Sequence, residues 1–455
     1  MNIPGAARYV FRVLELALAV IVTAGCSCLL LINWSRGPRE APRRRLLVLS
    51  TMYSLSALRL RQAEHLVTHR DLEGYFDHVW SIHPFVGAAP QDPPEDRVGP
   101  VAVTRLSPRH TMVEGRCGRF RCLERYPYLN FSLAQAQLVL LLDRIVRAEG
   151  VGIVRGDPYY CGLLALLLAR KNGRALEVRI VANFDTLYES AGELSHPRLI
   201  RWRSLERLIA RLNLSKADSV GAGSEDNRKF AIDNGARPER VAYTGNWNMI
   251  APVHLQSPAD RGQPSEFFGF GDRPVVICVS RLEVSKHPDD FVLSLAKARR
   301  QIDSLAGILV GEGSMRTRLE ELCSELGLDG QLAFAGERDQ SEIARLLAKA
   351  TVVAVPLAGL ALVESALSET PIVAYEVEWH GEFLQADSTG VLVPYRDTDA
   401  MAEAICDLVA DPERARNLGS AARTYALNKM DMTAVLESER RIAEGLLEQC
   451  PGFRS

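Results

Sequence analysis

The chain of 455 residues lacks the features that mark several common classes of protein. Its formal net charge is -2, so it has no overall positive field that would attract nucleic acid. Its nine cysteines are an odd number and are scattered from Cys26 to Cys450, without the dense spacing of a secreted disulfide framework. Cys117 and Cys122 lack CxxC spacing and have no second pair to complete a tetrahedral metal site. The scattered cysteines therefore indicate a protein of a reducing compartment.

Two motifs of cofactor and metal chemistry are missing or have a simpler explanation. A nicotinamide-dependent oxidoreductase needs GxGxxG directly after an early strand, whereas the first strand here runs on as RLLVLSTMYS. The letters DxD occur at 397–399, but they follow GVLVPYR and precede the helical pattern AMAEAICDLV, which favours a helix cap. We expect no cofactor and no metal.

One long apolar run is present, near the amino terminus. Residues 13–33, VLELALAVIVTAGCSCLLLIN, form 21 residues with one charge, which is long enough to cross a bilayer as a helix. Arginines follow the run at 36, 39, 43, 44 and 45, against two before it, so the downstream chain is predicted to face the cytoplasm. A cleaved signal peptide is the alternative. The long core, the basic flank and the poor lipoprotein box TAGC favour an uncleaved single-pass anchor over 1–35.

The rest of the chain alternates short aliphatic runs with helical patterns, which predicts an α/β protein with two doubly wound domains. The first domain, 44–250, has the strand candidates RLLVLS, HVWSIH, VAVTRLS, VGIVRG, LEVRIVAN, DSVGAGS and RVAYTGN. The second domain, 274–430, has VVICVS, GILVG, LAFAG, TVVAVP, PIVAY and GVLVP. Between them, 251–273 is rich in proline, glycine, serine and aspartate and reads as a linker. A last helix, 431–455, could return to the first domain.

The residues that follow the strands of the second domain suit a phosphate-bearing ligand. Open α/β sheets bind ligands beyond the carboxyl ends of their strands. VVICV is followed by Arg281 and Lys286, GILV by a glycine turn, and VVAVP by another turn that opens a helix carrying Glu364. Arginine and lysine form strong charge-assisted hydrogen bonds, and a carboxylate is the usual acceptor for ribose hydroxyls. The donor-side candidates in these turns are Gly311, Glu312, Gly313, Gly336, Gly359, Leu360 and Ala361.

Each of these features also has an ordinary structural explanation. Arg281 and Lys286 could be solvated surface charges, the glycines ordinary turns, and Glu364 an exposed helical carboxylate. In the first domain, Asp157 in RGDPYY and Asp185 in ANFDTLYES follow strands and so point to the cleft. Asp157 before a proline is also a common helix start, and it is only a candidate acceptor-side residue.

The second domain resembles the donor domain of GT-B glycosyltransferases, in particular glycosyltransferase family 4. The matching motifs are VSRLEVSK, VGEGSMRTRLE, FAGE, GLALVESALSETPIVAY and STGVLVP, in order over about 275–410. The first domain is similar more loosely, through VGIVRGDPYYCGLLALLLARKNG and KADSVGAGSEDNRKFAIDNGARPERV. The resemblance implies a GT-B fold of two Rossmann-like domains. It also implies that Arg281 and Lys286 hold the donor diphosphate, Glu364 the ribose, and the Gly311–Gly313 and Gly336 loops the base.

The resemblance also implies roles that the chain fits only in part. The family often has two glutamates separated by seven residues, and here the first position is Pro356. The first strand is followed by STMYSLS instead of a glycine pair. Asp185 lies where the family often places a histidine near the transferred sugar. The implied function is retaining, metal-independent transfer of a hexose from a nucleotide diphosphate sugar to a membrane-associated, lipid-linked saccharide. A GT-B sugar-nucleotide epimerase and an inactive, membrane-tethered donor-binding subunit are the alternatives.

Overall fold

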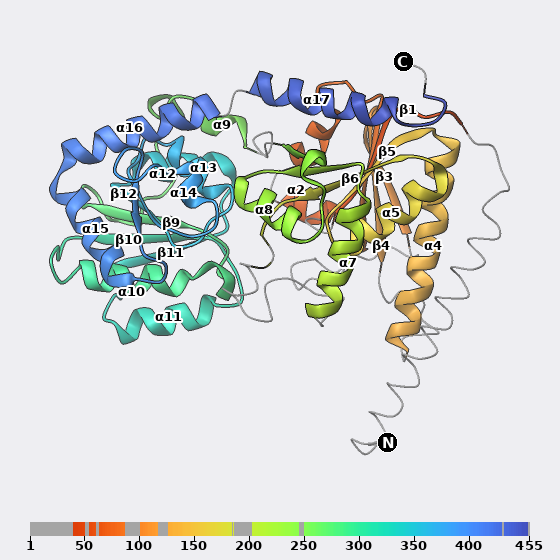
Figure 1. The fold of residues 1–455 in the computed structure, drawn as a ribbon. Helices are drawn as coiled ribbons and strands as arrows, with labels where there is room; N and C mark the ends of the chain where they lie inside the picture. The colour runs from red at the N-terminus through yellow and green to blue at the C-terminus, as the bar shows by residue number, and fades with distance from the viewer. Residues whose placement is uncertain are drawn as a thin grey trace, which may run out of the picture.

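The protein is built from two twisted sheets with helices on both faces of each (Figure 1). The computed structural model describes residues 40–50, 54–60, 63–86, 101–116, 126–183, 185, 203–244, 250–429 and 432–453. The predicted anchor at 13–33 lies outside the described residues.

The first sheet has eight strands in the order β3-β4-β2-β1-β5-β6-β7-β8. All neighbouring pairs are parallel except β3 with β4, which pair antiparallel at the edge. Sequence patterns had predicted seven of these strands and missed β4, which has polar and charged residues among its apolar ones. The strands are β1 (Arg43–Leu49), β2 (His78–Val86), β3 (Val101–Ser107), β4 (His110–Arg116), β5 (Val151–Gly156), β6 (Ala175–Ile180), β7 (Ser219–Ala222) and β8 (Val241–Tyr243).

Helices cover both faces of this sheet because its strands are apolar on both sides. One face carries α4 (Pro127–Ala148), α5 (Tyr160–Asn172), α7 (Arg203–Lys216) and α8 (Glu225–Asp233), which enclose the core around Leu142, Leu168 and Val178. Near the sheet lie also α2 (Leu55–Leu60), α3 (His65–Thr68), η1 (His69–Asp71) and η3 (Pro238–Arg240). Among the described helices, α4 is long and apolar enough to cross a membrane, but nearly half of that stretch is buried in the protein, as in a core helix.

The second sheet is parallel throughout, in the order β11-β10-β9-β12-β13-β14. Its strands are β9 (Val275–Val279), β10 (Ala306–Val310), β11 (Leu332–Gly336), β12 (Val352–Val355), β13 (Ile372–Tyr375) and β14 (Val391–Val393). Its helices are η6 (Val284–Lys286), α10 (Pro288–Ala298), α11 (Arg316–Glu325), α12 (Gln340–Lys349), α13 (Ala361–Ala366), α14 (His380–Phe383), α15 (Thr398–Ala410) and α16 (Pro412–Lys429). Separate apolar cores fill the two faces.

Residues 251–273, between the two sheets, are packed onto the second one. They include the short helices α9 (Pro252–Leu255) and η5 (Pro258–Arg261). Arg261 is buried and donates hydrogen bonds to the carbonyls of His254 (2.5 Å) and Leu367 (2.6 Å). The segment is therefore ordered by contacts that its composition does not reveal.

The last helix, α17 (Met432–Glu448), follows the second sheet in sequence but packs on the first (Figure 1). Ala443, Leu446 and Leu447 share a core with Leu46 and Ile153. Beside that core, Glu439 forms an ion pair with Arg179 of β6 (2.8 Å). α17 thus covers part of one face of the first sheet, although it follows the second sheet in the chain.

Candidate active site

Three loops at the carboxyl edge of the second sheet interlock through their backbones. The amide of Ser280 donates to the carbonyl of Val310 (3.0 Å), and the amide of Leu282 donates to the carbonyl of Glu312 (3.0 Å). The amide of Gly311 donates to the carbonyl of Gly336 (3.0 Å). The loops after β9, β10 and β11 therefore form one rigid platform.

Glycine is required where these loops touch. Gly311 has a φ of +133°, and a Cβ there would lie 1.9 Å from the carbonyl oxygen of Ser280. A Cβ at Gly313 would lie 2.4 Å from the carbonyl oxygen of Leu282. Loop packing alone thus accounts for both glycines. The neighbouring Glu312 is exposed and forms an ion pair with Arg316 (2.8 Å).

The platform presents two cations that no described residue neutralises by direct contact. Among the described residues, none forms a hydrogen bond or an ion pair within 4 Å with the side chain of Arg281 or Lys286. Burial lowers the pKa of Lys286 to about 8; the nearby Glu378 carboxylate opposes this shift and the Arg281 charge adds to it. Two cations without a direct partner among the described residues, on a loop fixed by backbone hydrogen bonds, are suited to bind an anion.

The loop after β12 places a carboxyl group at the same edge of the sheet, because β9 lies between β10 and β12. It runs through Gly359, Leu360 and Ala361 into the short helix α13. Gly359 is exposed, and nothing described lies within 4 Å of the position of a Cβ there. Glu364 on α13 is 7% exposed, and burial raises its pKa to about 7. At neutral pH the protonated and ionised forms of Glu364 are therefore present in comparable amounts.

His380, which sequence reasoning missed, fixes this loop. Its ring is fully buried, with Nδ1 2.9 Å from the carbonyl oxygen of Tyr375 and Nε2 3.2 Å from that of Ala358. Burial lowers the pKa of His380 to about 4, and the charge of Lys286 adds to this shift. A neutral histidine thus connects the loop after β12 to the turn after β13.

A second missed residue, Glu378, lies on the turn after β13. Its φ is +50°, and its Oε1 is buried without a hydrogen-bond partner among the described residues. Burial raises its pKa; Asp226 of the first half adds to this shift, and Lys286 opposes it. Glu378 therefore lies near charges from both halves of the chain.

The two halves meet directly at Glu382. Its carboxylate accepts hydrogen bonds from the backbone amides of Glu225 (2.7 Å) and Asp226 (2.8 Å), at the first turn of α8. A carboxylate at a helix amino terminus is favoured by both the free amides and the helix dipole. The loop after β13 is thereby connected to the first half.

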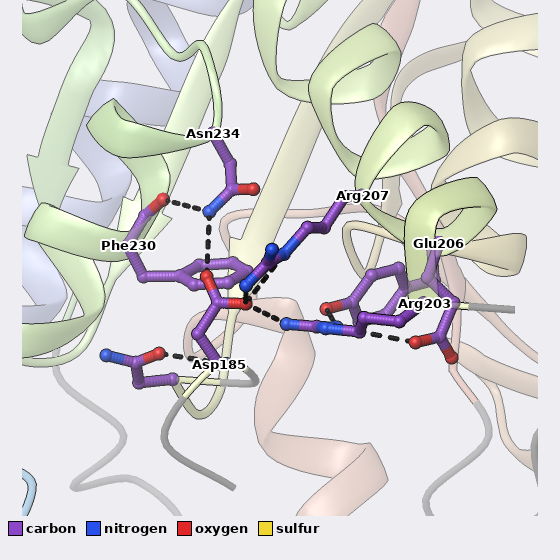
Figure 2. Close-up of polar contacts among 8 residues, drawn as sticks. Asp185, Arg203, Glu206, Arg207, Phe230 and Asn234 are labelled. Carbon is purple, nitrogen blue, oxygen red and sulfur yellow. Dashed lines mark hydrogen bonds and ion pairs between the residues drawn. The ribbon is translucent and has the colours of Figure 1, made fainter. Parts of the chain in front are cut away.

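Asp185 does not present a free carboxylate. It forms an ion pair with Arg203, a second with Arg207 (3.1 Å), and accepts a hydrogen bond from Asn234 Nδ2 (3.4 Å). Figure 2 shows both guanidinium groups reaching Asp185 from α7, while Arg203 also contacts Glu206. A sugar at this carboxylate would have to compete with two cations. In the structure, the residue joins the loop after β6 to α7 and α8.

Two other aspartates lie at helix starts. Asp157 accepts a hydrogen bond from the amide of Tyr159 (3.0 Å), just before α5, and its pKa is raised by burial. Asp397 is the N-cap of α15 and accepts from the amides of Asp399 (3.1 Å) and Ala400 (2.9 Å). The cap interpretation of the DxD letters is thus confirmed. Within the described residues, no cluster of potential metal ligands occurs.

Residues 263–425, which carry all the donor-side loops, match the family Glycosyl transferases group 1. By this match, residues 263–425 form a segment similar to glycosyl transferases group 1, which we call the group 1 domain. The resemblance read from VSRLEVSK and GLALVESALSETPIVAY is therefore confirmed.

Curated relatives share this domain and part of what surrounds it. The chain is 32% identical over 182 residues to a GDP-mannose-dependent alpha-(1-6)-phosphatidylinositol monomannoside mannosyltransferase of Mycolicibacterium smegmatis, which covers 38% of the chain and 48% of the relative. It is 29% identical over 244 residues to a D-inositol 3-phosphate glycosyltransferase of Rhodococcus opacus. This alignment covers 50% of the chain and 52% of the relative. The chain thus spans about half the length of these curated relatives.

Solved structures extend the similarity to both halves of the fold. Sucrose-phosphate synthase from Thermosynechococcus elongatus aligns with a TM-score of 0.67 at 20% identity, over 89% of this chain and 100% of that one. The Anabaena HepE protein in complex with UDP and glucose aligns with a TM-score of 0.63 at 17% identity, over 88% and 98%. At these identities the likeness shows the fold alone. The group 1 domain is the second half of a GT-B arrangement with two Rossmann-like sheets, as predicted.

Proposed function

We propose that the chain is a glycosyltransferase that moves a hexose from a nucleotide diphosphate sugar to a membrane-associated acceptor, a lipid-linked saccharide. The observation that carries this proposal is the pair of cations, Arg281 and Lys286, which no described residue contacts through a hydrogen bond or ion pair, at the sheet edge of the group 1 domain that also holds Glu364. The catalytic domains would face the cytoplasm. The mannosyltransferase relative acts, by its name, on a phosphatidylinositol-linked acceptor, which supports this acceptor class.

The proposed roles follow from charge and position. Arg281 and Lys286 contact the donor diphosphate, and Glu364 accepts hydrogen bonds from the ribose hydroxyls. The backbone from the exposed Gly359 to Ala361 lies beside the phosphates, while the loops of Gly311–Gly313 and Gly336 form the wall for the base. His380 and Glu382 are positioning residues, because they hold the loops after β12 and β13.

Transfer would proceed with retention and without a metal. The bond between the anomeric carbon and the diphosphate oxygen breaks, and the acceptor hydroxyl oxygen forms a new bond to that carbon on the same face. The hydroxyl proton passes to the departing diphosphate, so charge and atoms balance. Negative charge grows on the diphosphate as the bond breaks, and preorganised cations at that position stabilise the transition state.

A catalytically inactive, membrane-tethered donor-binding subunit is the second candidate, favoured by one observation. Pro356 occupies the position where the family often has the first of its two glutamates. The paired ion contacts of Asp185 leave no obvious substitute for that acid in the first half.

Purified full-length protein incubated with a panel of sugar nucleotides and lipid extract decides between these functions. We expect release of one nucleoside diphosphate together with a glycosylated lipid. Donor binding without release in any combination would support the inactive subunit. A changed sugar nucleotide without acceptor would indicate an epimerase.

A further inference from the structure

Three helices of the first half carry a leucine-rich outer surface. α5 packs between α4 and α7, and the three cover one face of the sheet (Figure 1). The buried side of α7 is formed by Glu206, Ala210, Asn213 and Leu214. On the opposite side, Leu205, Leu208 and Leu212 follow the helical repeat and face solvent, with Leu208 63% and Leu212 43% exposed. α4 and α5 add the exposed Leu140 and Leu167.

The exposed charges carried by these three helices are of one sign. The three helices contain two acidic residues, Asp143 and Glu206, and both side chains are buried. Arg144, Arg211 and Lys216 are exposed, and within the described part of the chain none of their side chains has a hydrogen bond or an ion pair. An exposed apolar stripe flanked by unpaired cations is the pattern of helices that lie in the interface of an anionic bilayer.

The chain connects this surface to its apolar amino-terminal run. The first described residue, Glu40, donates its amide to the carbonyl of Arg147 near the end of α4 (3.0 Å). The apolar run ends at Asn33, seven residues earlier in the sequence, a separation that an extended chain spans with about 25 Å. If that run enters a bilayer, the end of α4 is held close to the lipid surface.

We propose that the outer surface of α4, α5 and α7 docks on an anionic lipid bilayer. Leu208 and Leu212 enter the boundary between headgroups and acyl chains, and Arg144, Arg211 and Lys216 contact lipid phosphates. The surface acts in addition to the apolar run: a single tether leaves a domain free to rotate, whereas a second contact fixes its orientation. The proposal does not depend on the transferase activity.

Site-specific photo-crosslinking in nanodiscs tests this docking with the full chain. A benzophenone amino acid replaces Leu208, or, as a matched control, Leu326, an exposed leucine of the second half. Discs contain phosphatidylcholine with or without phosphatidylglycerol, and adducts are identified by mass. We expect at least tenfold more lipid adduct at position 208 than at 326 in anionic discs, and a clear decrease at 208 in neutral discs.

Charge reversal separates electrostatic docking from simple proximity. With Arg144→Glu, Arg211→Glu and Lys216→Glu combined, the adduct at position 208 should fall to the level of position 326. These side chains are exposed, so the fold should be retained, which circular dichroism checks. Equal adducts at 208 and 326, or no effect of the charges, would overturn the proposal. Adducts between two copies of the chain would show that this face is an oligomer interface instead. Because the readout is a lipid adduct, failure here leaves the proposed transferase function untouched.

Discussion

The carboxylate of Glu382, in the second half of the chain, caps helix α8 of the first half through the amide of Asp226, at 2.8 Å. A second hydrogen bond to the amide of Glu225 (2.7 Å) makes this a two-point contact across the halves. We call this arrangement, in which the two halves are in contact at Glu382, the closed state. It connects the turn after β13, which also carries Glu378 and His380, to the opposite half.

The first prediction concerns closure. Glu382→Ala removes the cap, and a charge at a helix amino terminus contributes about 1 kcal/mol, so the equilibrium constant in favour of the closed state should fall roughly fivefold. Small-angle scattering with bound nucleoside diphosphate should then give a larger radius of gyration. Glu376→Ala, an exposed glutamate of the same turn whose side chain has no described partner, is the control. Identical scattering from both variants would mean that the cap does not contribute to closure.

The second prediction concerns the cation pair. On the proposed mechanism, Lys286→Ala removes a preorganised cation beside the departing diphosphate, where negative charge develops; such a loss typically costs about 3 kcal/mol, on the order of a hundredfold in turnover. Lys297→Ala is the matched control, since Lys297 lies on α10 and pairs with Asp399 (2.7 Å). Nucleotide release by the two variants is compared at saturating donor. Near-normal turnover in Lys286→Ala would indicate that Arg281 and Lys286 are ordinary solvated charges and do not contact the donor.

The third prediction uses the titration of Glu364. Its pKa is about 7 in the folded protein because of burial, against an ordinary value of 4.5. Between these values the folded protein holds a proton that the unfolded chain has released. The resulting stabilisation is therefore complete below about pH 4.5 and is lost as the pH rises through 7. Between about pH 4.5 and 8 the free energy of unfolding of the parent should therefore fall by about 3 kcal/mol more than that of Glu364→Gln.

Unfolding in urea between pH 4.5 and 8 measures this loss, with the exposed Glu403→Gln as the control. Ligand binding provides a second readout of the same group. A charged acceptor for the ribose contributes roughly 1.5 to 3 kcal/mol, so the parent should bind nucleoside diphosphate at least tenfold more tightly than Glu364→Gln at pH 8. At pH 6, where Glu364 is mostly protonated, the difference in affinity between the parent and Glu364→Gln should be smaller. Equal affinities at pH 8 would show that Glu364 does not touch the donor.

The fourth prediction concerns the ion pair that attaches α17 to the first sheet. Glu439 is buried, and Arg179 pairs with both Glu439 and Glu177. Without Glu439, the two arginines Arg155 and Arg179 would share the single carboxylate of Glu177, so the loss should approach the value of about 3 kcal/mol that is typical of breaking a buried pair. Glu439→Ala should therefore unfold at markedly lower urea concentration, whereas Glu437→Ala, two residues away and exposed, should not. A similar midpoint for both would mean that α17 contributes little to the stability of the first half.

Much of the fold could be predicted from sequence because aliphatic strands and amphipathic helices have distinct periods. β4 escaped prediction because its Glu114 is buried by a long-range contact, in which it accepts a hydrogen bond from the amide of Leu55 (2.8 Å). The linker itself was predicted, but its packing onto the second sheet was not, since Arg261 finds a partner as distant in sequence as Leu367.

The site divides in the same way. Arg281, Lys286 and Glu364 belong to local motifs with fixed spacing, so the sequence alone indicated them. His380 and Glu382 act through partners 22 and 156 residues earlier in the chain. No local pattern encodes such contacts. For Asp185 the sequence predicted more than the structure shows. Its position after a strand suggested a contact with a ligand, but its carboxylate is paired with two arginines of α7.

The return of α17 to the first sheet has a consequence for synthesis on the ribosome. The first half emerges first, but the apolar face that includes Leu46 and Ile153 receives Ala443, Leu446 and Leu447 only after the whole group 1 domain has been made. Until then that face stays uncovered in a nascent chain, and uncovered apolar surface favours aggregation. Final folding of the first half therefore waits for the synthesis of α17, and a chain cut before α17 would expose an apolar face of the first sheet even though both sheets are complete.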